Sequence, residues 1–236
     1  REAGQSGGTQ QTGATAGEEN GNLNLIFRDV FTQTGIIPGS SIRGRLRAEM
    51  RQATSEEEAG YWYGNRAITG ETDSTTESRV KLEHAYIVWL PVFCPGQPIV
   101  WVSCPRLLRR YQRIAGDLVK LKDGTLLKEA TLPDAYTRSN KLQPLNVNDQ
   151  EKLFFNFGLL TIEQKADLSA RFPLGEELPA VIVADNEIGM VHDMALYRQS
   201  RVCLEDDEKK VKQGQFFNTE ALPEDTILVF AAALRK

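Results

Sequence analysis

Apolar residues occur in short runs along the chain, and the spacing within each run indicates the element that it forms. Ile42, Leu46 and Met50 lie four residues apart and predict a helix over 42–51, preceded by a serine N-cap. Further helices are expected at 106–114, 163–170 and 185–194, and strands at 24–28, 79–90, 99–102, 180–184, 196–202, 209–217 and 226–230. Helices and strands alternate with hairpins mixed in, which favours an α+β fold with an antiparallel sheet and helices on one face.

Polar stretches divide these elements. Residues 1–22 are rich in Gly, Ser, Thr and Gln and predict a disordered or loop segment, and the polar residues 54–78 predict a loop or insertion. The acidic stretch 205–208 lies between two predicted strands, as the tip of a hairpin would. The chain begins in a loop and stops just after an apolar strand. We therefore expect one domain over 23–236 that lacks strands at one or both ends, or that is a piece of a larger protein.

The charge balance limits the partners. The 236 residues carry 28 Lys+Arg and 32 Asp+Glu, a formal net charge of −4. This excludes a protein that coats nucleic acid with its whole surface, but it allows one basic face on an acidic body. The cations are concentrated at 43–51, 106–113 and 198–212. No apolar run approaches 18 residues, which argues against a membrane span, and the N-terminal residues do not form a secretory signal.

Cysteine and histidine are scarce. The three cysteines form no CxxC pair, and there are only two histidines, His84 and His192. A Cys/His zinc site needs four ligands close together, so neither that site nor Cys-His catalysis is expected. Thiols buried in a protein of the reducing cytoplasm are the interpretation that fits this usage.

The segment Ile37-Pro38-Gly39-Ser40-Ser41-Ile42-Arg43-Gly44-Arg45-Leu46-Arg47 is the most informative stretch of the sequence. Glycine and serines at a helix start leave backbone N–H groups free, and the helix dipole adds positive potential there. Arginines in the next two turns add charge and forked donors for phosphate. It is not a Walker loop, because no Gly-Lys-Ser/Thr follows the glycine. A capped surface helix with solvated arginines also explains these residues.

Four segments together resemble a known family. The string IPGSSIRGRLR (37–47) is similar to the IPGSS signature of RAMP proteins, the backbone subunits of type III CRISPR effector complexes. SRVKLEHA (78–85) resembles a second family block, with His84 where an aspartate is usual. Residues 90–110 and 201–226 resemble two more, and the block at 90–110 is closer to the Cmr-type than to the Csm-type subunit. The four blocks occur in the family's order and run from about Leu23 to Phe230.

The resemblance implies a fold and a function. Such subunits have a ferredoxin-like, RRM-like palm with an antiparallel sheet, insertions and a β-hairpin thumb. They stack along a CRISPR RNA, hold its phosphates, and pair with neighbouring copies and other effector subunits in antiviral defence. Target single-stranded RNA pairs with the guide between the thumbs. The implied protein is cytoplasmic in a bacterium or archaeon and has no membrane partner.

The resemblance also assigns candidate site residues. The guide-binding motif falls on Gly39, Ser40, Ser41, Arg43, Arg45 and Arg47. The thumb region falls on about 190–217, and its candidates for phosphate contacts are Arg198, Arg201, Lys209 and Lys210. Met190 and Met194 are candidates for the apolar wedge of the thumb. Core packing of the methionines and a solvated charged turn for the lysines are equally compatible with the sequence.

The resemblance also implies an aspartate on a palm loop that supports metal-dependent cleavage of the target RNA, and the sequence departs from the family at this residue. In the family this residue precedes the proline of IPGSS by about fifteen residues, which points to Leu23, and no carboxylate occupies that spot here. An amide such as Asn22 or Asn24 cannot act as a base and binds a divalent cation poorly. The nearest acids are Glu18, Glu19 and Asp29. The hypothesis is that this copy binds guide and target RNA without cutting.

Two alternatives remain open. The first is an active, metal-dependent endoribonuclease of the same assembly, with its acid supplied by Asp29, Glu18 or Glu19. The second is a stand-alone RRM-like or α/β enzyme unrelated to CRISPR. The resemblance implies no tightly bound cofactor, no resident metal site, and Mg²⁺ or another divalent cation only if the subunit cleaves RNA.

Overall fold

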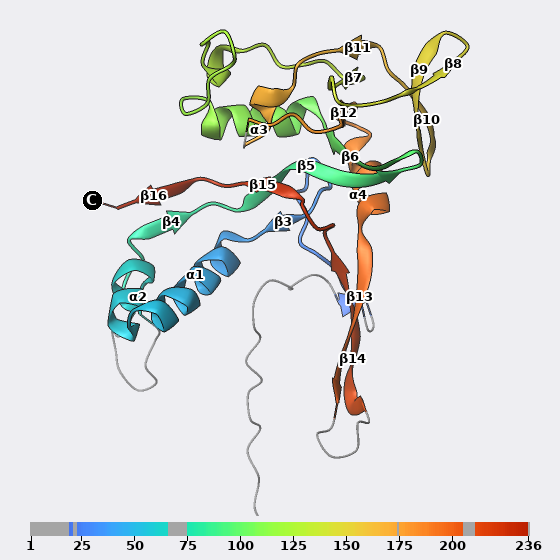
Figure 1. The fold of residues 1–236 in the computed structure, drawn as a ribbon. Coiled ribbons are helices and arrows are strands. Elements are labelled where there is room, and N and C mark those ends of the chain that lie inside the picture. Colours follow the sequence, from blue (N-terminus) through green and yellow to red (C-terminus); the bar gives the residue numbers. More distant parts are fainter. Residues whose placement is uncertain (1–18, 21–22, 66–74, 174, 205–210, 236) are drawn as a thin grey trace, which may run out of the picture.

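The computed structural model describes residues 19–20, 23–65, 75–173, 175–204 and 211–235. A body built around one sheet carries two projections, an arm that contains α1 and α2 and a hairpin formed by β13 and β14 (Figure 1). Within the described residues no helix is long and apolar enough to cross a membrane.

The sheet of the body follows the order β11-β7-β12-β6-β5-β15, and β3 also pairs with β5. Its strands are β3 (Ile36–Ile37), β5 (Ala85–Cys94), β6 (Gln97–Ser103), β7 (Thr137–Arg138), β11 (Gln164–Lys165), β12 (Ala180–Ile182) and β15 (Ile227–Val229). The long β5–β6 hairpin forms its centre, with Leu90 opposite Val102. The predicted strands at 99–102, 180–184 and 226–230 are therefore confirmed in type, with shifted ends. The single strand predicted at 79–90 is divided, because Val80–Leu82 pairs in another sheet and only the part from Ala85 onward belongs to this one.

The sheet is mixed, so the prediction of an antiparallel sheet is correct only in part. β12 pairs with β6 in parallel, and β11 pairs with β7 in parallel. The helix α3 (Pro105–Ala115) follows β6, and the connection from α3 to β12 also contains β7 to β11. Two parallel neighbours need a crossover connection, and the predicted helix at 106–114 is confirmed as its first element.

The core lies on both faces of this sheet because successive residues of a strand point to opposite sides. In β12, Val181 belongs to one buried cluster, whereas Ala180 and Ile182 belong to the other. The second cluster also holds α3, and within it Trp89 stacks on Phe172 with ring centroids 4.4 Å apart. The first cluster includes α4 (Ile188–Ala195), the helix predicted at 185–194.

Above the sheet, an antiparallel subsheet was not predicted from the sequence. Its strands are β8 (Leu145–Val147), β9 (Gln150–Phe155) and β10 (Gly158–Thr161). Leu153 and Phe155 of β9 point into the core. The helix predicted at 163–170 is wrong, because Gln164–Lys165 form β11 and only the short 3₁₀ helix Ser169–Arg171 follows.

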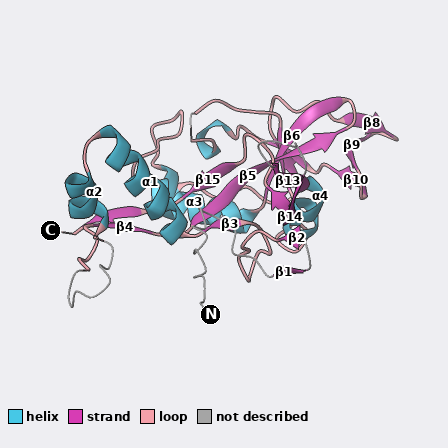
Figure 2. Cartoon of the chain, turned by 90° about the horizontal axis from the view of Figure 1, so that it is seen from below, coloured by secondary structure: helices cyan, strands magenta, loops and turns pink. Residues whose placement is uncertain are grey.

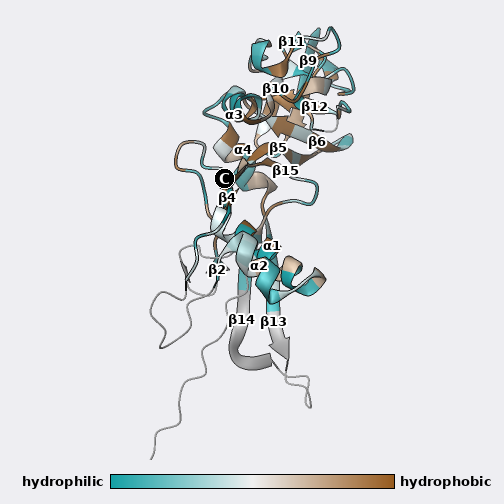
Figure 3. Ribbon diagram, turned by 90° about the vertical axis from the view of Figure 1, so that its left-hand side faces the viewer, coloured by the Kyte–Doolittle hydropathy of each residue, from teal (hydrophilic) through white to brown (hydrophobic). Residues whose placement is uncertain are grey.

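The arm consists of α1 (Gly39–Ala53), α2 (Glu56–Tyr63), β4 (Val80–Leu82) and β16 (Ala232–Leu234). The loop prediction for 54–78 is wrong over α2, where Ser55 accepts a hydrogen bond from the Glu58 amide and caps the helix. Among the described residues of these four elements, Ala59 is the single fully buried apolar side chain. In Figure 3 the brown, hydrophobic residues are concentrated in strands of the body, whereas α1 and α2 are mostly teal and white.

The hairpin consists of β13 (Tyr197–Leu204) and β14 (Val211–Ala221), antiparallel with Tyr197 opposite Ala221. Two short strands from the chain before α1 extend the sheet of the hairpin. β2 (Leu23–Asn24) pairs with β14 in parallel, and β1 (Glu19–Asn20) pairs with β2 in antiparallel orientation. The strand predicted at 24–28 is thus shorter and shifted. The predicted tip at 205–208 and most of the predicted loop 1–22 lie outside the described residues. Figure 2, a view from below, shows β13 and β14 beside α4 and far from α2.

Candidate nucleic-acid interface

The start of α1 is fixed against the corner between β4 and β5. The Gly39 amide donates a hydrogen bond to Nδ1 of His84 at 3.0 Å. A Cβ at position 39 would lie only 2.5 Å from the carbonyl oxygen of Leu82, so glycine is required for this close approach. The amides of Ser41 and Ile42 donate to the Pro38 carbonyl. Gly39 is buried and its amide is engaged, so it positions the helix and does not offer a free donor.

One face of α1 is open to solvent. Ser40 and Arg43 are exposed, and a Cβ at Gly44 would meet nothing within 4 Å. These residues lie three and four positions apart and therefore share a face of the helix. No acidic residue occupies the first turn of α1. The helix dipole and Arg43 both place positive potential at this face, and Ser41 lies beside it half-buried.

The three arginines of the motif have different surroundings. Arg45 forms an ion pair with Glu49, 2.6 Å apart, on the exposed surface. Arg47 turns toward Glu56 of α2 at 3.5 Å, and only 15% of its side chain is exposed. Within the described residues Arg43 has no carboxylate in ion-pair range. Of the three, Arg43 is thus the guanidinium that is free to meet a ligand.

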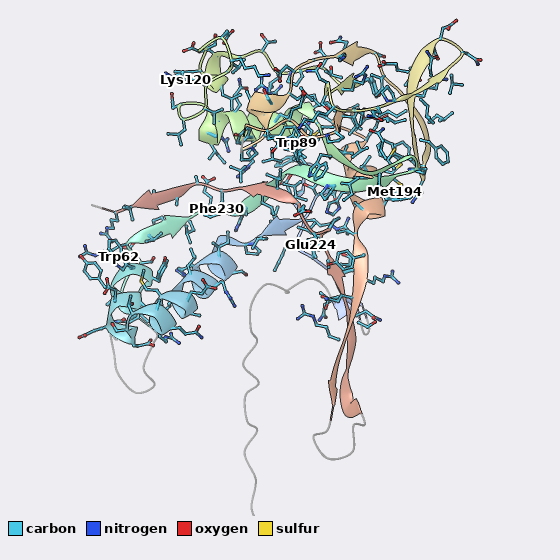
Figure 4. All side chains as sticks on the ribbon, in the orientation of Figure 1. Trp62, Trp89, Lys120, Met194, Glu224 and Phe230 are labelled. Carbon is cyan, nitrogen blue, oxygen red and sulfur yellow. The ribbon has the colours of Figure 1, made fainter. Side chains whose placement is uncertain are left out.

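The predicted thumb residues lie at the base and along the hairpin. Arg198 and Arg201 are exposed on β13, and Lys209 and Lys210 lie outside the described residues. Met190 on α4 is 47% exposed. Met194 is half-buried where the body meets the hairpin, as its label in Figure 4 marks.

A polar network connects the hairpin base to the segment that leads into α1. Arg28 lies 2.5 Å from Asp193 of α4 and 3.5 Å from Glu220 of β14. His192 is completely buried, and its Nε2 accepts a hydrogen bond from the Gly35 amide at 2.9 Å. Burial, followed by the nearby Arg28 charge, lowers the pKa of His192. The neutral imidazole is the form that can accept this hydrogen bond.

The candidate catalytic acid Asp29 stabilises a turn through its side-chain carboxylate. Its carboxylate accepts hydrogen bonds from the Thr32 amide at 2.9 Å and from the Thr32 hydroxyl at 2.8 Å. Glu18 lies outside the described residues, as does the side chain of Glu19. The part of the chain that the structure describes contains no group of three or more His, Cys, Asp or Glu residues that could hold a metal ion.

Sequence reasoning missed two features of this region. The first is Gly44, which belongs to the motif but was not singled out; a glycine in the middle of a helix is the signal that could have found it. The second is the exposure of Val30 and Phe31. The sequence predicts a turn at 32–35, but it did not single out these two apolar residues. Two large apolar residues followed by Thr-Gln-Thr-Gly were its signal in the sequence.

The fold and this surface define an α+β protein whose candidate chemistry lies on an exposed helix face and a projecting hairpin. The chain belongs to the RAMP superfamily, whose family model matches residues 6–235. This agrees with the resemblance carried by the four sequence blocks.

Solved structures share the fold at low sequence identity. A chain of the type III-B Cmr-beta complex bound to cognate target RNA is 17% identical with a TM-score of 0.60, covering 95% of this chain and 80% of that chain. Oligomeric Cmr4 from Pyrococcus furiosus is 18% identical with a TM-score of 0.57, covering 89% of this chain and 75% of that one. A search of curated proteins gave no match.

Proposed function

We propose that this chain is a guide-RNA-binding backbone subunit of a type III CRISPR effector complex. The observation that carries the proposal is the open face of α1, where Ser40, Arg43 and Gly44 stand clear of the rest of the protein. Membership of the RAMP superfamily and a fold shared with Cmr-type subunits support it.

In this proposal the central sheet with α1 and α3 is the ferredoxin-like palm, and the β13–β14 hairpin is the thumb. The palm holds the guide phosphates at the start of α1, and the thumb meets the paired guide and target bases. Other copies of the subunit and other effector subunits are its protein partners, and the assembly works in the cytoplasm. In a split βαβ unit another strand lies between the two parallel strands, whereas here β12 pairs directly with β6.

Gly44 supports a close approach of the RNA backbone. Glycine inside a helix costs about 0.5–1 kcal/mol relative to alanine. Packing within the described protein does not require it, because apart from the chain neighbours and the backbone of α1 itself no atom lies within 4 Å of a Cβ at this position. An RNA backbone lying against the helix would explain a glycine at position 44, because glycine permits a close approach of another backbone.

Co-expression with a CRISPR array tests the proposal. We expect the purified protein to carry RNA, and we expect Arg43→Ala to reduce the bound fraction. Arg45→Ala is the matched control, because Arg45 stands on the same helix but is paired with Glu49. A wild-type protein that purifies free of nucleic acid, or equal losses for the two variants, would contradict the proposal.

We further propose that this copy binds RNA without cutting it. Asp29 is occupied by both polar hydrogens of Thr32, and the position that corresponds to the family's catalytic acid is Leu23. A divalent cation would bind only if Glu18, Glu19 or Asp29 supplied its ligands. Incubating the assembled complex with labelled target RNA and magnesium tests this, and intact target opposite this subunit is the expected result.

A further inference from the structure

The turn that precedes β3 is held rigidly by its own hydrogen bonds. The Asp29 carboxylate accepts from Thr32, as described above, and the Asp29 amide donates to the Thr34 carbonyl at 2.8 Å. The amide of Gln33 donates to the Asp29 carbonyl, and its side-chain amide donates to the Val30 carbonyl at 2.7 Å. Gln33 adopts a left-handed φ of 56° to close the turn. Little conformational freedom remains to be lost when a ligand binds here.

This rigid turn displays two large apolar side chains to solvent. Val30 is 78% exposed and Phe31 is 80% exposed. A single exposed apolar residue is ordinary, but two adjacent ones on a turn fixed by this many hydrogen bonds are presented to a partner. Neither side chain belongs to a buried cluster of the described protein.

An arginine face adjoins the turn. The guanidinium of Arg106, at the start of α3, donates from Nη1 to the Phe31 carbonyl at 3.4 Å. Arg109 and Arg113 follow at positions three and seven along the same helix face, and both are exposed. Neither forms an ion pair within the described residues, and α3 carries no acidic residue. From Arg106 to Arg113 this face extends for about 10 Å at 1.5 Å per residue.

We propose that the turn and the arginine face together form a second binding site for single-stranded RNA, separate from the start of α1. One base stacks on the Phe31 ring, and the phosphates that follow lie along Arg106, Arg109 and Arg113. This proposal rests on the proposed function, since it assigns a further stretch of RNA to the same subunit.

Stacking aromatics beside a basic track are the combination by which proteins bind single strands without reading their sequence. Within the described residues Arg109 and Arg113 form no ion pair, whereas Arg106 lies 3.8 Å from Asp185. The forked donors of a free arginine match the geometry of phosphate oxygens. An acidic protein surface could neutralise the same arginines, but it would give the exposed Phe31 ring no planar partner. The juxtaposition of ring and arginines therefore favours RNA.

Binding of a labelled 30-nucleotide oligouridylate to the purified protein tests the site. We expect Phe31→Ala to weaken binding by about 10-fold, as the loss of one stacked base does elsewhere. We expect the double change Arg109→Ala and Arg113→Ala to reduce the slope of log affinity against log salt by about 1.4, at about 0.7 per phosphate contact. Both positions are exposed, so neither change removes a core contact.

The matched control removes two positive charges elsewhere. Lys122 and Lys128 are paired with Asp167 and Asp117, each at 2.5 Å, so Lys122→Ala with Lys128→Ala should leave the salt slope unchanged. Equal slopes for the two double variants, or an unchanged affinity for Phe31→Ala, would overturn the proposal and favour an acidic protein partner for α3.

Photocrosslinking separates this site from the proposed function. With 4-thiouridine in the RNA, crosslinks to peptides that contain 29–34 and to peptides that contain 40–44 are both expected. Crosslinks confined to 40–44 would overturn the second site and leave the guide-binding proposal intact. Crosslinks confined to 29–34 would do the reverse, and a protein that crosslinks at neither segment would overturn both.

Discussion

The backbone amide of Gly39 donates a hydrogen bond to Nδ1 of His84, and this contact joins the first residue of α1 to the corner between β4 and β5. The family block that residues 78–85 resemble has an aspartate at the position of His84. An imidazole nitrogen can serve as the acceptor in place of a carboxylate oxygen, so the exchange preserves the contact that orients the helix.

Removing this acceptor should loosen α1. His84→Ala is expected to destabilise the protein by about 1 kcal/mol, the usual net value of one hydrogen bond. His84→Asp should retain most of the stability, because a carboxylate can accept from the same amide. Urea unfolding of the three proteins measures the difference, and equal losses for both variants would show that the contact has no energetic role.

His192 should make the stability of the protein depend on pH. Burial and the nearby Arg28 charge lower the pKa of His192 in the folded protein. Below about pH 6.5 the imidazole therefore binds a proton in the unfolded chain but stays neutral in the folded protein. The stability contributed by neutral His192 is therefore complete above about pH 6.5 and is lost as the pH falls toward the lowered pKa. The limiting slope is about 1.4 kcal/mol per pH unit.

His192→Gln checks this prediction, because a glutamine oxygen can accept from the Gly35 amide but does not titrate. We expect the variant to flatten the pH dependence of the unfolding free energy between pH 6.5 and 5. His84→Gln is the control, since the chain has only these two histidines and His84 is exposed. If the pH dependence disappears in His84→Gln and persists in His192→Gln, it arises from His84 and the prediction is wrong.

Gly44→Ala should change stability and RNA binding in opposite directions. The added methyl group has open space around it and alanine favours the helix, so the free protein should gain about 0.5–1 kcal/mol. The same methyl group should weaken RNA binding if the guide backbone lies against this face. Thermal unfolding and RNA affinity measured on one preparation give both values, and a stabilised variant with unchanged affinity would place the RNA elsewhere.

Asp29 should act on the turn and not on a phosphodiester bond. Asp29→Ala removes the acceptor for the Thr32 amide and hydroxyl, and we expect a loss of about 1 kcal/mol. Asp29→Asn keeps one oxygen for these donors and should recover part of it. Target RNA incubated with magnesium should remain intact with all three proteins. Magnesium-dependent cleavage by the wild type that is lost in a folded Asp29→Ala protein would identify Asp29 as a catalyst.

Elements with a strong local pattern were predictable from the sequence. The apolar spacing of Ile42, Leu46 and Met50 gave the position of α1, and the uninterrupted run 180–184 gave that of β12. The helix α2 was missed because its first turn is acidic and it lies within a largely polar stretch, although Ser55 followed by Glu58 matches the pattern of a capping box. Residues 164–165 are polar and suit a helix locally, but pairing with β7 makes them a strand.

The candidate site was predictable as a segment but not as individual side chains. The resemblance puts Arg43 ahead of Arg45 and Arg47 as a contact to the guide backbone, but the sequence does not show what surrounds each arginine. The difference between Arg43 and Arg47 arises from α2, which places Glu56 next to Arg47 and nothing next to Arg43. The second arginine cluster was visible in the sequence, but its contact with Phe31 depends on how the turn folds against α3.

The arm has few buried apolar side chains, and this gives it a different exchange behaviour from the body. Elements with little buried apolar surface open locally at low free energy, whereas a sheet covered on both faces exchanges its amides only when the whole domain unfolds. The amides of α1 and α2 should thus exchange with deuterium well before those of β5 and β12 in the free protein. The arm contains the helix proposed to hold the guide, so a bound guide should slow the exchange of the α1 amides relative to the free protein.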